Sequence, residues 1–202
     1  KERLVEEIKY LKTYGGKDGP DVPSNVFSHS DGNYNILLES NGRNNHLSRE
    51  AVRNIIASKV RIYLINNGCS LEPFKDNFLI NEKKDEINVG VEISASEVNV
   101  DFTYPITVER GDSLVELRAF NLVLEDNLGY ILEPLVLGII NGYVANEEFN
   151  VLSYCADNGY YCDPDNSGSG EKRIDVYNSK EDFESDDAEN VFRFVVVTWK
   201  KL

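Results

Sequence analysis

Three cysteines are the residues of this 202-residue chain with the clearest capacity for chemistry. Cys155 and Cys162 are seven positions apart, and a turn that contains Gly159 separates them. Oxidising compartments permit disulfides, so the spacing favours a disulfide between these two residues. Cys69 would then be unpaired, although it could instead pair with either of the others. The alternative is a set of free thiols in a cytosolic protein.

A short acidic run directly after Cys162 partly matches a calcium loop. Asp163, Asp165 and Ser167 stand at positions one, three and five of such a loop. The bidentate glutamate of position twelve is missing, because Ile174 stands there. The sequence therefore gives a weak calcium hypothesis for Asp163, Asp165 and Ser167, and a flexible acidic surface loop is the favoured interpretation.

Other reactive patterns are weaker. His29 and His46 stand alone in predicted loops and there is no Cys-x-x-Cys pair, so we expect no zinc site. There is no G-x-S-x-G motif and no phosphate-binding glycine loop. We therefore expect no catalytic residues and no cofactor. One alternative stays open, a secreted or surface hydrolase whose site is built from scattered carboxylates.

Charge and hydropathy exclude several classes of partner. The formal net charge of −14 argues against nucleic acid and against an anionic membrane surface, because both require clustered Lys and Arg. No apolar run approaches the roughly 20 residues that span a bilayer. The chain opens on Lys1 and contains no methionine, so we expect a processed product or a soluble part of a longer protein.

The central stretch, residues 87–146, predicts the sheet that organises the fold. Apolar and polar residues alternate over 87–93 and 98–108, the period of two of half-buried strands. A third run changes phase near Arg118 and Ala119, which predicts a β-bulge. Pro105 has no N–H and predicts a bulge or an edge at its own position.

A wide apolar stripe at helical spacing follows, over residues 128–144. Pro134 either opens this helix at its first position or kinks a longer helix that begins near Asn127. The expected fold class is α+β: an antiparallel β-meander with amphipathic helices packed on one face.

The N-terminal part predicts a helix over residues 1–14 and a long loop over 17–45 with one weak strand at 36–38. Ser48 is expected to cap a second helix that ends at Asn67. We divide the chain into an N-terminal helix with a linker-like loop, residues 1–46, and an α+β domain, residues 47–202.

The C-terminal part predicts a helix that Asn146 caps and that ends near Asn158. Two strands are expected at 173–177 and 191–199, and the second is apolar enough to be central. The carboxylates between residues 181 and 189 are expected to lie in a solvated loop between these strands.

Several motifs together carry a resemblance. They are a helix ending in Asn-Asn-Gly-Cys, the strand DFTYPITVERGD, the segment LRAF before a long helix, a cysteine-containing helix and a final FRFVVV strand. This order resembles the ectodomain of small archaeal surface proteins that follow a pilin-like N-terminal membrane helix. The resemblance implies a single-pass anchor upstream of Lys1 and an extracytoplasmic location. The family brings no established activity, so no functional residue is carried over.

The expected function is therefore that of a non-enzymatic surface module for assembly, adhesion or partner binding. Its partners would be other proteins or copies of itself, in a filament or surface assembly, with exposed sheet edges available for strand addition. Membrane contact would come only through the missing anchor. A third interpretation, a cytosolic acidic scaffold, requires free thiols and no anchor.

Overall fold

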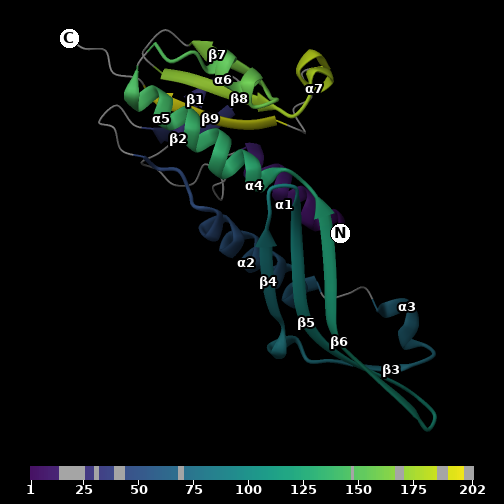
Figure 1. Ribbon diagram of the computed structural model, residues 1–202. Coiled ribbons are helices and arrows are strands. Elements are labelled where there is room, and N and C mark those ends of the chain that lie inside the picture. Colours follow the sequence, from purple (N-terminus) through teal and green to yellow (C-terminus); the bar gives the residue numbers. More distant parts are fainter. Residues whose placement is uncertain are drawn as a thin grey trace.

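The computed structural model describes residues 1–13, 26–29, 32–38, 44–67, 71–146, 148–166, 171–185 and 191–197. For residues 26–29, 32–36, 38 and 166 it describes the backbone alone. Helices and mainly antiparallel sheets make up an α+β fold, as the sequence predicts. The two sheets lie toward opposite ends of an elongated molecule (Figure 1).

The first sheet has four strands, β3 (Leu79–Glu82), β4 (Asn88–Ile93), β5 (Glu97–Arg110) and β6 (Ser113–Glu125). The long strand β5 pairs with β6 on one side and with both β3 and β4 on the other. Gly111, at φ 58°, turns β5 into β6, in the left-handed region that suits glycine. Strands β4, β5 and β6 form the predicted meander.

A bulge interrupts the β5–β6 pairing where the sequence predicts it. Thr103 pairs with Ala119 and Ile106 with Leu117, so two residues of β5 lie opposite the single residue Arg118. The extra residue is on β5, where Pro105 supplies no N–H to the ladder. The carbonyl oxygen of Pro105 accepts a hydrogen bond from the Lys83 N–H at 3.0 Å, which fastens the segment after β3 to the bulge.

One continuous helix follows β6, through α4 (Leu128–Tyr130), the π-helical turn η2 (Ile131–Val136) and α5 (Leu137–Ala145). Pro134 lies inside the π turn, so the alternative of a longer helix that begins near Asn127 is confirmed. The side chain of Asp126, two residues before the first residue of α4, accepts a hydrogen bond from the Leu128 N–H at 2.7 Å.

This helix corrects the expectation that no apolar run approaches membrane-spanning length. Leu128–Ala145 is long and apolar enough to cross a membrane by length and composition alone. However, half of it is buried inside the structure, where Ile131, Leu135 and Ile139 are fully inaccessible to solvent. A core helix meets the same criterion.

The second sheet has five strands in the order β1 (Val26–His29), β2 (Gly32–Leu38), β9 (Val191–Val197), β8 (Glu171–Tyr177) and β7 (Tyr161–Asn166). The prediction that the final strand is central is confirmed. Strand β2 runs parallel to β9, which the expectation of an antiparallel fold did not include. A parallel pair needs a long connection, and here it is most of the chain. The predicted weak strand is the end of β2.

The remaining helices are α1 (Glu2–Thr13), α2 (Arg49–Asn67), α3 (Glu72–Lys75), the 3₁₀ turn η1 (Lys84–Glu86), α6 (Val151–Asp157) and α7 (Lys180–Ser185). The bounds of α1 and α2 agree with the sequence, and the Ser48 hydroxyl accepts a hydrogen bond from the Ala51 N–H, as expected. Asn150, not Asn146, caps α6 through a hydrogen bond from the Ser153 N–H. Helix α7 occupies part of the segment that was expected to be a loop.

One apolar core joins the two sheets, and a separate, smaller cluster contains Leu64, Ile87, Tyr104 and Ile106. The core includes residues of α1, α2, the meander, the long helix and the second sheet, among them Leu4, Ile56, Val100, Ile139 and Phe194. Helices cover one face of the first sheet. Its other face is exposed and polar, and there Asn121 donates hydrogen bonds to Asn99 and Asp101 at 2.6 and 2.8 Å.

Candidate functional site

A disulfide joins Cys155 and Cys162 in the structure, the pairing that the sequence favours. Their Cα atoms are 6.0 Å apart, and both side chains are buried. Cys155 lies on α6 and Cys162 on β7, so the bond fastens a helix to the second sheet. Cys69 lies outside the described residues.

The calcium hypothesis gains no support from the residues that the structure describes. Asp163 and Asp165 lie on strand β7, paired with β8, so the expected flexible loop is wrong for these two residues. The carboxylate of Asp165 lies 3.8 Å from the guanidinium of Arg173, which supplies a positive charge without a metal. Ser167 lies outside the described residues. In the described ranges no three His, Cys, Asp or Glu side chains form a group that could hold a metal ion.

A buried charge cluster lies beside these two acids on the second sheet. The Asp175 carboxylate is 3.2 Å from Nε of Arg173 and 3.1 Å from Nε of Arg193. Burial raises the pKa of Asp175, the two guanidinium groups oppose that rise, and Asp163 adds to it. Among the carboxyl groups that the structure describes, Asp175 is the one with a raised pKa. Because Asp175 is buried between two arginines, the cluster has the character of a structural network rather than of a catalytic pair.

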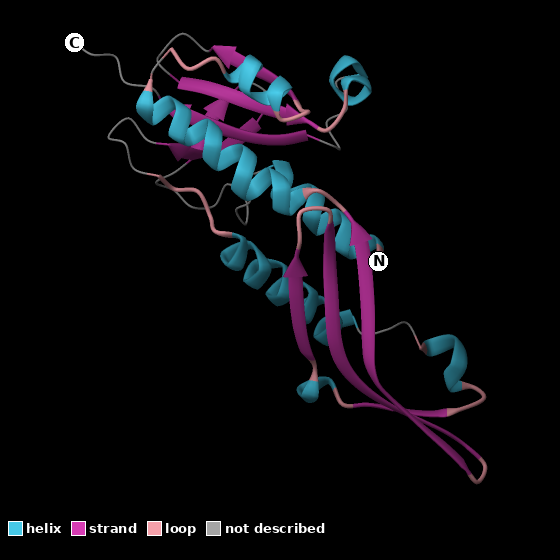
Figure 2. Cartoon of the chain, in the orientation of Figure 1, coloured by secondary structure: helices cyan, strands magenta, loops and turns pink. Residues whose placement is uncertain are grey.

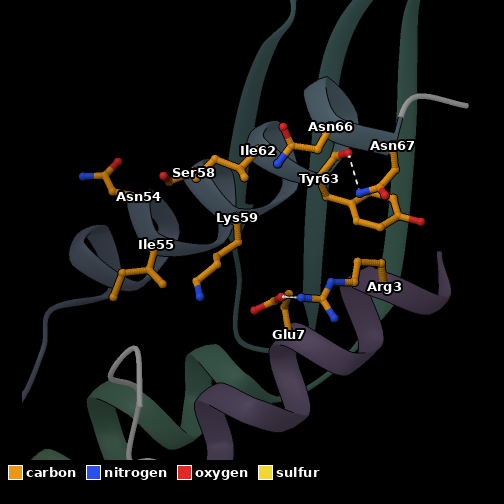
Figure 3. Close-up of a pocket in the computed structure, with 10 residues that line it drawn as sticks. All are labelled: Arg3, Glu7, Asn54, Ile55, Ser58, Lys59, Ile62, Tyr63, Asn66 and Asn67. Atoms are coloured by element: carbon orange, nitrogen blue, oxygen red, sulfur yellow. Dashed lines mark hydrogen bonds and ion pairs between the residues drawn. The ribbon is translucent and has the colours of Figure 1, made fainter. Parts of the chain in front are cut away.

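A groove of about 680 Å³ lies between α1 and α2 (Figure 3). Its lining residues are Arg3, Glu7, Asn54, Ile55, Ser58, Lys59, Ile62, Tyr63, Asn66 and Asn67. Arg3 forms an ion pair with Glu7 one helical turn away. The Arg3 guanidinium also lies 6.0 Å from the centre of the Tyr63 ring.

The chemistry of the groove is that of hydrogen bonding, not of acid–base catalysis. Its single carboxylate, Glu7, is buried and engaged by Arg3, so no second carboxylate faces it across the groove. Ser58 and Tyr63 carry the side-chain hydroxyl groups of the lining, which contains neither histidine nor cysteine as a partner. The lining of this groove therefore offers no pair of carboxylates for hydrolysis.

A second candidate site is the end of the β5–β6 hairpin, which extends away from the helices (Figure 2). We call the part beyond the bulge, residues 106–117, the arm. Leu114, Val115 and Leu117 of the arm are 64%, 54% and 44% exposed. Because successive side chains alternate between the faces of a strand, Val115 and Leu117 lie on one face of the arm and Leu114 on the other, so the arm exposes apolar side chains on both faces.

The arm also carries an open strand edge. Strand β6 pairs with β5 alone among the strands that the structure describes, so the side of β6 that faces away from β5 has no partner strand there. We call this side the open edge. Backbone N–H and C=O groups along such an edge can pair with another strand.

The open edge lacks most features that protect natural edge strands. Thirteen residues is long for an edge strand, β6 contains neither proline nor lysine, and the bulge is on β5. The two charges on its exposed half, Glu116 and Arg118, contact each other at 2.8 Å. The sequence predicts exposed sheet edges only in general terms. The sequence signal that could have identified the open edge is strand length, because β5 and β6 are each longer than β3 and β4 combined.

Comparisons of the chain with protein-family models, with curated proteins and with solved structures find no match.

Proposed function

We propose that this chain is a non-enzymatic, extracytoplasmic surface module that acts in assembly, adhesion or partner binding. It is tethered by a membrane helix upstream of Lys1 and binds proteins through the open edge of β6. The observation that carries this proposal is the open edge itself: a long, regular strand without a partner among the described strands, bordered by exposed Leu114, Val115 and Leu117. Strand addition at such an edge gives affinity through the backbone and specificity through side chains.

Two further features support the location and the mode of binding. The Cys155–Cys162 disulfide fits an oxidising compartment outside the cytosol. Ile106 and Val108 of β5 pack in one cluster with Leu64 of α2, whereas Val115 and Leu117 of β6 remain exposed, so a partner strand can approach the arm from the open edge. The net charge of −14 keeps such a module soluble despite its exposed apolar arm.

Photo-crosslinking in the native host tests the proposal. A photoreactive residue at Val115, 54% exposed, should give covalent adducts with another polypeptide. The matched control is Leu152 on α6, which is 53% exposed but lies on a helix. Adducts from Val115 and not from Leu152 support binding through the arm. Equal yields from both positions, or none from either, contradict it.

A further inference from the structure

The open edge of β6 carries a charge pattern that is complementary to itself. Glu116 and Arg118 flank Leu117 at equal distance along the strand, and both are exposed, with side chains 37% and 65% accessible. Directly opposite residues of antiparallel strands interact across about 5 Å, a distance that opposite charges can bridge. A partner strand that matches this edge therefore needs the reverse order of charges, positive then negative, around an apolar residue.

A second copy of β6 in antiparallel orientation supplies that order. When Leu117 of one copy faces Leu117 of the other, each Glu116 faces the Arg118 of the second copy, and the pair of strands contains this contact twice. Other registers lose it. A slip by one residue sets Glu116 opposite Ala119, and a slip by two sets Arg118 opposite Arg118 or Glu116 opposite Glu116. Like charges in that position are destabilising.

The apolar residues agree with the same register. Leu114 lies opposite Phe120 of the second copy and Val115 lies opposite Ala119. The exposed apolar side chains of the arm therefore gain apolar neighbours. The paired segment runs from Ser113 to Asn121, about 30 Å of strand. It ends before Leu124 and Glu125, beside which α1 packs, and so leaves that helix undisturbed.

We propose that two copies of this chain associate through antiparallel pairing of β6 with β6, centred on Leu117, with Glu116 of each copy bound to Arg118 of the other. The pairing joins the two four-stranded sheets into one continuous sheet with a two-fold axis at Leu117. The inference rests on the proposed function and names its partner, a second copy of this chain.

Charge exchange tests the register. Wild-type protein should form a species of twice the 22.9 kDa chain mass in sedimentation velocity. Glu116→Arg sets Arg opposite Arg, and Arg118→Glu sets Glu opposite Glu, so each variant alone should associate at least about tenfold more weakly. An equimolar mixture of the two variants restores both opposite-charge contacts and should dimerise like the wild type. The double variant E116R/R118E should do the same.

The mixture separates this register from every other mode of association. Both side chains are exposed, so neither substitution threatens the fold, which circular dichroism verifies. A wild-type protein that stays monomeric at about 100 µM, or a mixture no tighter than its components, overturns self-pairing. The proposed function stands if Val115 adducts in the host still form with a different protein. It fails separately if the crosslinking at Val115 fails.

Discussion

At the scale of single residues, Asp175 shows how a buried acid can be structural and still titrate. Its carboxylate lies between Arg173 and Arg193 and is 1% exposed as a residue. Burial nevertheless outweighs the two cations, so the pKa of Asp175 is raised. At pH values between the unfolded and the folded pKa of Asp175, the folded state holds a proton that the unfolded state has lost. The free energy of unfolding therefore falls as the pH rises through the folded pKa.

Asp175→Asn should therefore resemble the protonated protein. We expect it to match the wild type near pH 4 and to change the unfolding free energy at pH 7 by less than about 1 kcal/mol, because Arg173 keeps Asp165 as a partner. Arg193→Met should cost about 3 kcal/mol at pH 7, since it leaves the ionised carboxylate less compensated, and should cost less near pH 4. Urea unfolding between pH 4 and pH 8 measures both variants.

His46 supplies the control, because its effect has the opposite sign. Burial lowers the pKa of His46, so the unfolded state binds the extra proton and stability falls as pH drops below about 6.5. This loss occurs in wild type and Asp175→Asn alike and cancels in their difference. A difference between the two proteins that is independent of pH would contradict the role given to Asp175.

At the scale of elements, one junction holds the first sheet to the long helix. Gly129 of α4 lies against the turn between β4 and β5, where an added Cβ would lie well inside contact distance of the Ser94 carbonyl oxygen and 2.9 Å from Ile93 Cγ2. Arg49, at the start of α2, donates hydrogen bonds to the carbonyl oxygens of Gly129 and Ile93 at 3.2 and 3.4 Å. Three elements therefore meet at a position where only glycine fits.

Gly129→Ala should destabilise the protein by about 1–3 kcal/mol, because the backbone at Ser94 must move to make room. For a chain of this length that corresponds to a melting temperature lower by roughly 3–10 °C. Gly90→Ala is the matched control: its added Cβ meets only the Asp101 carbonyl oxygen, at 3.8 Å, and Ala suits a strand better than Gly. Equal melting temperatures for Gly129→Ala and Gly90→Ala would show that α4 and the β4–β5 turn can move apart at little cost in stability.

The disulfide acts at the same scale, between α6 and β7. It closes a short loop, and chain entropy assigns such a loop about 2–3 kcal/mol. Reduction should therefore lower the melting temperature by roughly 5–10 °C. Cys69→Ser should show the same shift, since the effect belongs to Cys155 and Cys162. An intact mass that is unchanged by reductant under denaturing conditions would show that the bond does not form.

The elements divide into those that local pattern determines and those that it does not. Strict alternation in residues 98–108 predicted β5, and the phase change within the next run near Arg118, together with the missing N–H of Pro105, predicted the bulge. The pairing of β2 with β9 could not be predicted, because periodicity defines a strand and not its partner. For the same reason Asp163 and Asp165 resembled a loop until β8 was placed beside them. The division of the chain at residue 46 stays a prediction.

The candidate site was foreseen only as a class. The sequence predicts exposed edges in a meander, but an edge is open only if no other segment pairs with it, which depends on the whole topology. From the sequence alone, Glu116 and Arg118 are ordinary surface charges, and their possible role follows only once β6 is known to be an edge strand. The α1–α2 groove was not foreseen, because it depends on how two separate helices pack.

At the scale of the whole molecule, the net charge of −14 opposes any association between two copies. The local contacts between Glu116 and Arg118 are exposed, and such pairs contribute only about 0.2–1 kcal/mol each. Repulsion between the two copies acts over a longer range, and salt reduces it strongly as the Debye length falls from about 30 Å at 0.01 M to about 8 Å at 0.15 M. The long-range repulsion between the net charges of the two copies should therefore dominate the response of the affinity to salt.

Self-association through β6 should consequently strengthen as salt rises from about 0.01 M to about 0.15 M. The mixture of Glu116→Arg and Arg118→Glu copies has the same total charge as a wild-type pair, because each substitution offsets the other, so its salt dependence should match. Sedimentation equilibrium across this range measures both. An affinity that falls with salt would mean that attraction between opposite charges dominates the complex. The apolar contacts of Leu114, Val115 and Leu117 would then not be its main source of stability, and the backbone pairing that the structure offers along β6 would be secondary to charge.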